Sequence, residues 1–320
     1  MNGIVRISLV FAVVFWHFPN PDIYSDVSFI NPVSSDLAVK IFFILSGGII
    51  AKLQMNSNFS AALFLRNRAF FLIVPMFCFL AFYFLGYYLI ILDEKIYGAD
   101  LLNLLLLNLF YLFLPSMNSS TEGVFMPHIW SLSYEFYFYI IALLIARLTR
   151  LGLVRFFALV STGLLFMTLL WSPITHKGFI VNLVFFMCPW AIVRSQIFMK
   201  LTELPGRILR IINSIVTGLL FLVVCFGGKI QFIEYLCVTV ALMLIVLDTI
   251  QKPVKYNRVL GRLTLYIYLS HLGVNYVVWI LLPNVATVWL SLTSLTICFF
   301  VSAFGIYVEF LGRKSSPLKT

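Results

Sequence analysis

Residues 129–149 read IWSLSYEFYFYIIALLIARLT, and this stretch decides the fold class of the chain. Its length is about 20 residues, which is what an α-helix needs to cross the hydrocarbon core of a bilayer. No charged side chain occurs between Glu135 and Arg147. The stretch therefore predicts a membrane-spanning helix that carries a carboxylate, Glu135, one or two turns inside the membrane.

Comparable apolar stretches follow one another along almost the whole chain. The 320 residues are 62% hydrophobic and 11% charged, with a mean hydropathy of +1.03, whereas soluble domains carry about 25% charged residues. No water-soluble fold of this size could bury so much apolar surface. We expect an all-α polytopic transmembrane bundle, one integral-membrane domain over 1–320 without an appended soluble domain. About ten spans are expected, at 4–18, 34–53, 69–92, 129–149, 154–171, 178–195, 209–226, 231–249, 260–281 and 287–311.

Basic residues indicate the orientation of this bundle. With a cytoplasmic N-terminus, the cytoplasmic segments hold all of the 22 Lys and Arg residues except four, namely Lys40, Lys95, Lys177 and Lys229. Such a bias is typical of membrane topology. It accounts for the net charge of +10 without nucleic acid, which we do not expect as a partner. Both termini are expected in the cytoplasm.

Residues 101–115 form one more apolar run, and this run does not fit the count. It is short for a span and contains Asn103 and Asn108. Counting it as a span would invert every later loop. We therefore expect a re-entrant or interfacial segment, packed in protein or lining a cavity.

Arg6 and His17 are ionisable residues in the first expected span. A separation of eleven residues places them about 20° apart in azimuth and about 16 Å apart in depth on a helix. They share one face, with Arg6 near the cytoplasmic end and His17 near the outer end. This face either lines a polar passage, or Arg6 snorkels to headgroups while His17 forms an interfacial hydrogen bond.

Glu135 needs a polar partner, because a charge inside the bilayer costs a few kcal/mol or more. One candidate is His17 at similar depth, since a carboxylate can orient an imidazole and make it a general base. Lys40 is an alternative partner, as are Ser and Tyr hydroxyls. Trp130 belongs either to the same site or to an ordinary aromatic belt.

Four further residues are candidates for binding. Ser46 can donate a hydrogen bond, and as a nucleophile it would need an adjacent base. Arg66 and Arg68 stand before the third expected span, where membrane topology alone explains positive charge and phosphate binding is a second explanation. His271 lies in the middle of an expected span, where an ionisable side chain is a functional candidate.

These motifs, in this order, resemble the acyltransferase-3 family of integral-membrane enzymes, which transfer acyl groups, often acetyl from acetyl-CoA, to hydroxyls of surface polysaccharides. Arg6 and His17 match the family's Arg, ten residues, His pattern. Residues 41–47 are similar to its Phe-Phe-x-x-Ser-Gly helix. Residues 130–137 look like its Trp-Ser-Leu-x-x-Glu element, and residues 266–271 resemble its late Tyr-Leu-x-His element.

The match has two departures. Lys40 stands where the family often has an aspartate, two residues before the Phe-Phe pair, so a role of that acid is in doubt here. Arg66 and Arg68 are a shifted match to the family's basic motif.

The resemblance implies an O-acyltransferase of the bacterial cytoplasmic (inner) membrane. It would move an acyl group, acetyl being expected, from acyl-CoA to a polysaccharide such as an exopolysaccharide or the O-antigen of lipopolysaccharide. Its expected residues are His17 and Glu135 for catalysis, Arg6, Arg66 and Arg68 for acyl-CoA, and Ser46, Trp130 and His271 for substrate. Acetyl-CoA acts as co-substrate, and neither a tightly bound cofactor nor a metal is expected.

The expected partners are acyl-CoA, a polysaccharide or lipid-linked glycan acceptor, and membrane lipids. A multi-span transporter or flippase for a glycan or small metabolite is the alternative function, because it would also need buried charge and a polar passage.

Overall fold

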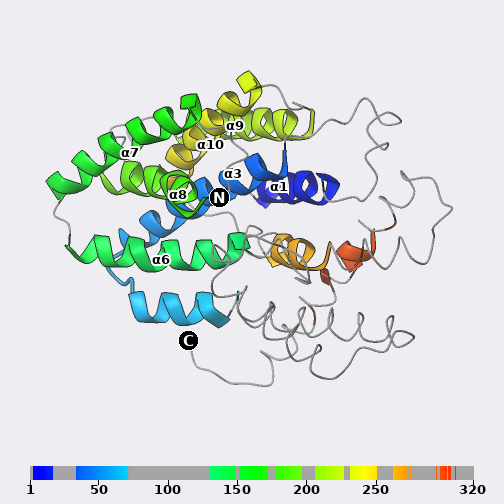
Figure 1. Ribbon diagram of the computed structural model, residues 1–320, viewed down its shortest axis with the longest axis horizontal. Helices are drawn as coiled ribbons and strands as arrows, with labels where there is room; N and C mark the ends of the chain where they lie inside the picture. The colour runs from blue at the N-terminus through cyan, green and yellow to red at the C-terminus, as the bar shows by residue number, and fades with distance from the viewer. Residues whose placement is uncertain are drawn as a thin grey trace. The chain divides into compact units, whose positions relative to one another are not determined.

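The computed structural model describes residues 3–16, 34–70, 72, 130–148, 151–171, 178–196, 206–226, 231–250, 262–271, 274, 293, 296–300, 302–303 and 307. Within these residues every regular element is helical, which confirms the all-α prediction. The labelled helices in Figure 1 are α1 (Gly3–Trp16), α3 (Ser35–Gln54), α6 (Trp130–Leu148), α7 (Leu151–Trp171), α8 (Phe179–Arg194), α9 (Gly206–Phe226) and α10 (Gln231–Ile250). Further helical residues lie at 61–70, 262–271 and 296–300.

The labelled helices agree with the expected spans to within about three residues at each end, as is usual for helix boundaries. Helix α3, for example, covers Ser35–Gln54 where 34–53 was expected. Most of the expected span 69–92 and all of residues 101–115 lie outside the described residues.

Among the described residues, one helix, Trp130–Leu148, is both long and apolar enough to cross a membrane. Shorter apolar helical stretches of 10–17 residues lie in α1, α7, α8, α9 and α10. Several helices also expose large apolar side chains, such as Leu159 at 74% and Ile215 at 64%. Exposed apolar faces of this kind suit contact with lipid or protein better than contact with water. The number of ten spans stays a prediction.

The chain divides into two compact units, and the boundary between them falls inside α3. The first unit comprises Met1–Phe42 and Glu203–Thr320, and the second comprises Phe43–Thr202. In the first unit α1 packs against α9, which also packs against α10. In the second unit α8 packs against both α6 and α7.

In the second unit, α3 and α6 run in the same direction. Ser46 contacts Glu135 near the start of the shared interface, and Gln54 contacts Ala142 farther along both helices. The expected topology requires this parallel alignment of its second and fourth spans.

Helices α3 and α8 approach one another closely at Gly47. A Cβ atom at this position would overlap the carbonyl oxygen of Phe186 and lie 3.2 Å from Cγ of Pro189. Pro189 lies inside α8, where its ring removes a backbone donor and disturbs the preceding turn. Because only a residue without a side chain fits here, Gly47 sets the spacing of the two helices next to Ser46.

A helix at 61–70 precedes most of the expected third span, of which residues 69, 70 and 72 are described. Ser60 caps it, since the amide of Leu63 donates to Ser60 Oγ at 3.4 Å. A serine cap followed by Ala and Leu residues favours helix. Arg66 and Arg68 lie within this helix.

Candidate active site

Ser46 of α3 and Glu135 of α6 are joined across the interface between their helices. The Ser46 hydroxyl donates to Glu135 Oε1 at 2.6 Å. Ser46 is only 2% exposed, while Glu135 is partly buried. A short O–H···O⁻ distance is typical of a charge-assisted hydrogen bond. A buried hydroxyl thus anchors one oxygen of the carboxylate.

Tyr139 donates a second hydrogen bond to the same oxygen of Glu135. The spacing of four residues places both side chains on one face of α6, and Tyr139 is fully buried. Two hydroxyl protons therefore point at Oε1. In the described part of the chain no donor contacts Oε2.

Arg68, on the helix at 61–70, packs against the same tyrosine. Its guanidinium carbon lies 5.2 Å from the ring centroid of Tyr139 and 5.4 Å from that of Phe64, within the range of a cation–π interaction. Arg66 is exposed, because two residues turn a helix by about 200°. The structure thus brings Arg68 to Tyr139 and leaves Arg66 on another side of the helix. We call Ser46, Arg68, Glu135 and Tyr139 the Glu135 cluster.

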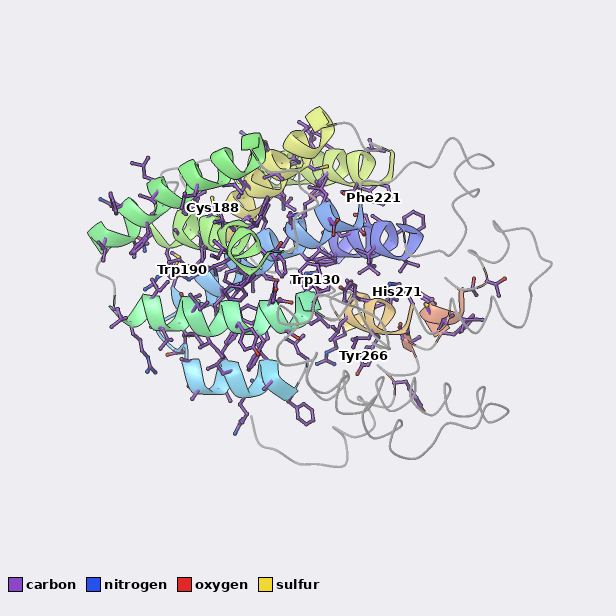
Figure 2. The ribbon with its side chains drawn as sticks, in the orientation of Figure 1. Trp130, Cys188, Trp190, Phe221, Tyr266 and His271 are labelled. Carbon is purple, nitrogen blue, oxygen red and sulfur yellow. The ribbon has the colours of Figure 1, made fainter. Side chains whose placement is uncertain are left out.

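Aromatic rings surround this cluster. The ring of Phe43 lies 5.3 Å from that of Phe138 and 6.3 Å from that of Trp130, and the Tyr139 ring lies 5.6 Å from that of Phe186. An apolar surrounding of this kind strengthens the hydrogen bonds inside it. Trp130 stands at the first turn of α6 (Figure 2) and is partly exposed. Its predicted contact with substrate stays a prediction.

A second polar contact, which we call the Gln54 clamp, ties the C-terminal part of α3 to α6 and α8. Gln54 Oε1 accepts a hydrogen bond from the Trp190 indole at 2.8 Å, and Nε2 donates to the carbonyl of Ala142 at 3.4 Å. The backbone carbonyl of Gln54 accepts from Arg194 at 3.2 Å. Figure 2 shows Trp190 on α8. Because each of these polar groups of Gln54 forms a hydrogen bond with a protein group, we interpret the clamp as structural.

The other predicted site residues lie in the first unit. Arg6 is partly buried in α1, and Lys40 is buried in the first half of α3. His271, on the helix at 262–271 (Figure 2), is fully buried. Its Nδ1 lies 2.6 Å from the Tyr268 carbonyl, which can only accept, so Nδ1 carries the proton. His17 lies outside the described residues, and its pairing with Glu135 stays a prediction.

Ser and Tyr hydroxyls were one of the alternatives to His17 as partners of Glu135. In the described residues the partners are indeed of this kind, namely Ser46 and Tyr139. Tyr139 and Gln54 were not among the site residues predicted from the sequence. The spacing of Tyr139 four residues after the carboxylate was a usable signal, since such pairs meet on a helix. Gln54 carried no such signal, because its partners come from α6 and α8.

Comparison with known families agrees with the resemblance of the motifs. The model of the acyltransferase-3 family, described as an acyltransferase domain, matches residues 4–308. No curated protein and no solved structure matches the chain significantly. The matched region spans nearly the whole chain and contains the entire Glu135 cluster. The chain belongs to the acyltransferase-3 family.

Proposed function

We propose that this protein is a membrane O-acyltransferase that moves an acyl group, acetyl in the first instance, from acyl-CoA to a hydroxyl of a cell-surface polysaccharide. The observation that supports this most is the Glu135 cluster. Two buried hydroxyls hold one oxygen of a carboxylate inside an aromatic interior, and an arginine stacks beside them. Family membership supplies the class of reaction.

In the proposed reaction the acceptor hydroxyl oxygen attacks the carbonyl carbon of the acyl thioester. A C–O bond forms and the C–S bond breaks. The hydroxyl proton passes to a general base, and coenzyme A leaves as a thiolate that takes up a proton. We assign the role of general base to His17. This residue forms a sequence motif with Arg6, and an imidazole titrates near neutral pH.

Glu135 is assigned to orienting this base. Ser46 and Tyr139 occupy Oε1, so Oε2 can accept a hydrogen bond from an imidazole N–H and stabilise its protonated form. Ser46 then serves the substrate indirectly, through its hold on Glu135. The role of His17 in this step is inferred from the sequence motif alone.

Arginines are assigned to the phosphates of acyl-CoA. Guanidinium groups recognise phosphate through several N–H donors, and Arg68 lies over the Tyr139 ring with its side chain only partly buried. Arg66 and Arg6 complete the proposed donor site. Trp130 and His271 are the proposed contacts to the acceptor.

The proposed location is the bacterial inner membrane, with both termini in the cytoplasm. Acetyl-CoA would enter from the cytoplasm, and the acceptor, a polysaccharide such as an O-antigen or exopolysaccharide or its lipid-linked precursor, would be presented from the outer side. The distribution of basic residues supports this orientation,.

The test is transfer of radiolabelled acetyl from acetyl-CoA to glycan extracted from cells lacking the protein. Membranes that contain the wild-type protein should label the glycan, and surface polysaccharide from cells with the protein should show O-acetyl signals by NMR. A transporter would move its substrate unmodified and leave the glycan unlabelled, which would overturn the proposal. Arg155→Gln, on the exposed part of α7, is the control variant and should transfer label normally.

The assignment of His17 and Glu135 to one step is tested by a double-mutant cycle. If Glu135 acts through His17, Glu135→Gln should lower the rate in the wild type and cause little further loss in the His17→Ala background. Independent, multiplying losses would overturn the pairing, and normal transfer by His17→Ala would remove His17 from the step.

A further inference from the structure

Tyr139 contacts both ionisable residues of the Glu135 cluster. Its hydroxyl donates to Glu135 Oε1, and its ring lies under the guanidinium of Arg68, 5.2 Å from centroid to guanidinium carbon. The Tyr139 side chain thus contacts Glu135 through its hydroxyl oxygen and Arg68 through the face of its ring. One fully buried residue links the two groups that the proposed reaction uses for different tasks.

Packing holds the Tyr139 ring in place from two further sides. The Phe64 ring stands edge-on to it at 5.2 Å and 87°, and the Phe186 ring at 5.6 Å and 74°. Phe186 is also the residue whose carbonyl abuts Gly47. A ring enclosed in this way has little rotational freedom. Its hydroxyl therefore has a fixed position relative to Glu135.

The two contacts do not occupy every hydrogen-bonding atom of Glu135 and Arg68. A cation–π contact is not a hydrogen bond to the guanidinium N–H groups, so these donors can still bind a phosphate. A carboxylate held through Oε1 can use Oε2 for an imidazole or a hydroxyl. Tyr139 thus orients each group without occupying the atoms that the proposed reaction requires.

We propose that Tyr139 is a positioning residue for acyl transfer, which holds Glu135 through its hydroxyl and Arg68 through its ring. This inference rests on the proposed function. It assigns the hydroxyl to the chemical step and the ring to binding of the donor. Loss of the hydroxyl should therefore change kcat, and loss of the ring should also change KM for acyl-CoA.

Three variants separate these contributions in the purified full-length protein in lipid nanodiscs. Tyr139→Phe keeps the ring, so we expect KM for acetyl-CoA near the wild-type value and kcat about tenfold lower, as for loss of a hydrogen bond to a charged group. Tyr139→Leu removes hydroxyl and ring, and KM should also rise about fivefold through loss of the cation–π contact. Tyr307→Phe, at an exposed tyrosine, is the matched control and should behave as wild type.

A purely structural tyrosine would lower Tm in Tyr139→Phe while kcat per folded molecule stays at the wild-type value, and that result would overturn the proposal. Equal KM values in Tyr139→Phe and Tyr139→Leu would overturn the role of the ring. Should Tyr139→Leu fail to fold, Arg68→Met tests the same contact from the other side. Because Tyr139→Phe keeps the ring, Arg68→Met should raise KM by the same factor in the wild-type and Tyr139→Phe backgrounds. A larger rise in the wild-type background would show that the hydroxyl contributes to donor binding, which would contradict the division of roles.

Failure of this inference differs from failure of the proposed function. If the wild-type protein transfers no acetyl to any glycan hydroxyl, the function is wrong. If the wild type transfers acetyl and Tyr139→Phe does so at an unchanged kcat, only the role of Tyr139 is wrong.

Discussion

The Glu135 cluster and the Gln54 clamp both join α3 to α6 by polar contacts, about 12 Å apart along α3 for a separation of eight residues. In the clamp, the side-chain oxygen, side-chain nitrogen and backbone carbonyl of Gln54 each meet a protein group. In the cluster, two donors share one oxygen of Glu135. No described donor contacts its other oxygen.

This difference separates a structural contact from a reactive one. An amide whose oxygen and nitrogen both bond to protein groups stabilises helix packing. A carboxylate held by one oxygen has a fixed direction and keeps an acceptor for a substrate or a base. Five substitutions and one control variant can break or sharpen this contrast.

Glu135→Gln is expected to have the largest effect. Glutamine keeps the shape and can still accept from Ser46 and Tyr139, but it removes the charge that would stabilise a protonated base. We expect the acetylation rate to fall about 100-fold or more, with normal amounts of protein in the membrane. An initial-rate assay with labelled acetyl-CoA, normalised to folded protein, measures this. A rate near that of the wild type would place Glu135 with Gln54 among structural contacts.

Gly47→Ala tests the helix contact on which both regions depend. The added methyl group would overlap the Phe186 carbonyl, and overpacking of this kind costs about 1–3 kcal/mol. We expect a lower Tm in nanodiscs and less protein in the membrane.

Gly163→Ala is the matched control for this change, because nothing lies within 4 Å of a Cβ there. Its Tm should be unchanged or slightly higher, since alanine favours helix. Equal Tm values for the two variants would show that α3 and α8 do not approach as closely as described.

Ser46→Ala and Gln54→Leu should have opposite consequences. Loss of the Ser46 hydroxyl removes one of two hydrogen bonds to a charged group, so we expect about a tenfold lower rate and little change in Tm. Gln54→Leu leaves the Trp190 indole N–H without its acceptor, so Tm should fall while the rate per folded molecule stays near wild type. Paired rate and Tm measurements decide this, and an exchange of the two phenotypes would reverse our assignment of the regions.

Trp190→Phe should have the smallest effect. It deletes the indole N–H that donates to Gln54 Oε1 and keeps most of the apolar volume. One neutral hydrogen bond contributes about 1 kcal/mol, so a small drop in Tm is expected without a change in rate. A loss of rate larger than that of Ser46→Ala would show that the clamp takes part in the reaction.

Helix positions were largely predictable from the sequence. Uninterrupted apolar runs between basic clusters placed α3, α6 and α8 to within a residue at each end. The helix at 61–70 was not among the predicted elements, although its serine cap is a local signal for where it starts,.

Candidate residues were predictable as individuals but not as a group. The cost of a charge in an apolar span singled out Glu135, and the motifs singled out Ser46, Arg66 and Arg68. Spacing along the chain could not tell which arginine faces α6. The structure answers that for Arg68.

The sequence by itself determined the all-helical class, the approximate bounds of the labelled helices and the family, because each depends on local composition or on the order of short motifs. The tertiary structure alone decided that Ser46 and Tyr139 share one oxygen of Glu135 and that Gln54 is bound by Trp190 and Arg194. Such contacts join residues as many as 140 positions apart. They depend on how α3, α6 and α8 are rotated and spaced, which packing at sites such as Gly47 fixes and no local pattern encodes.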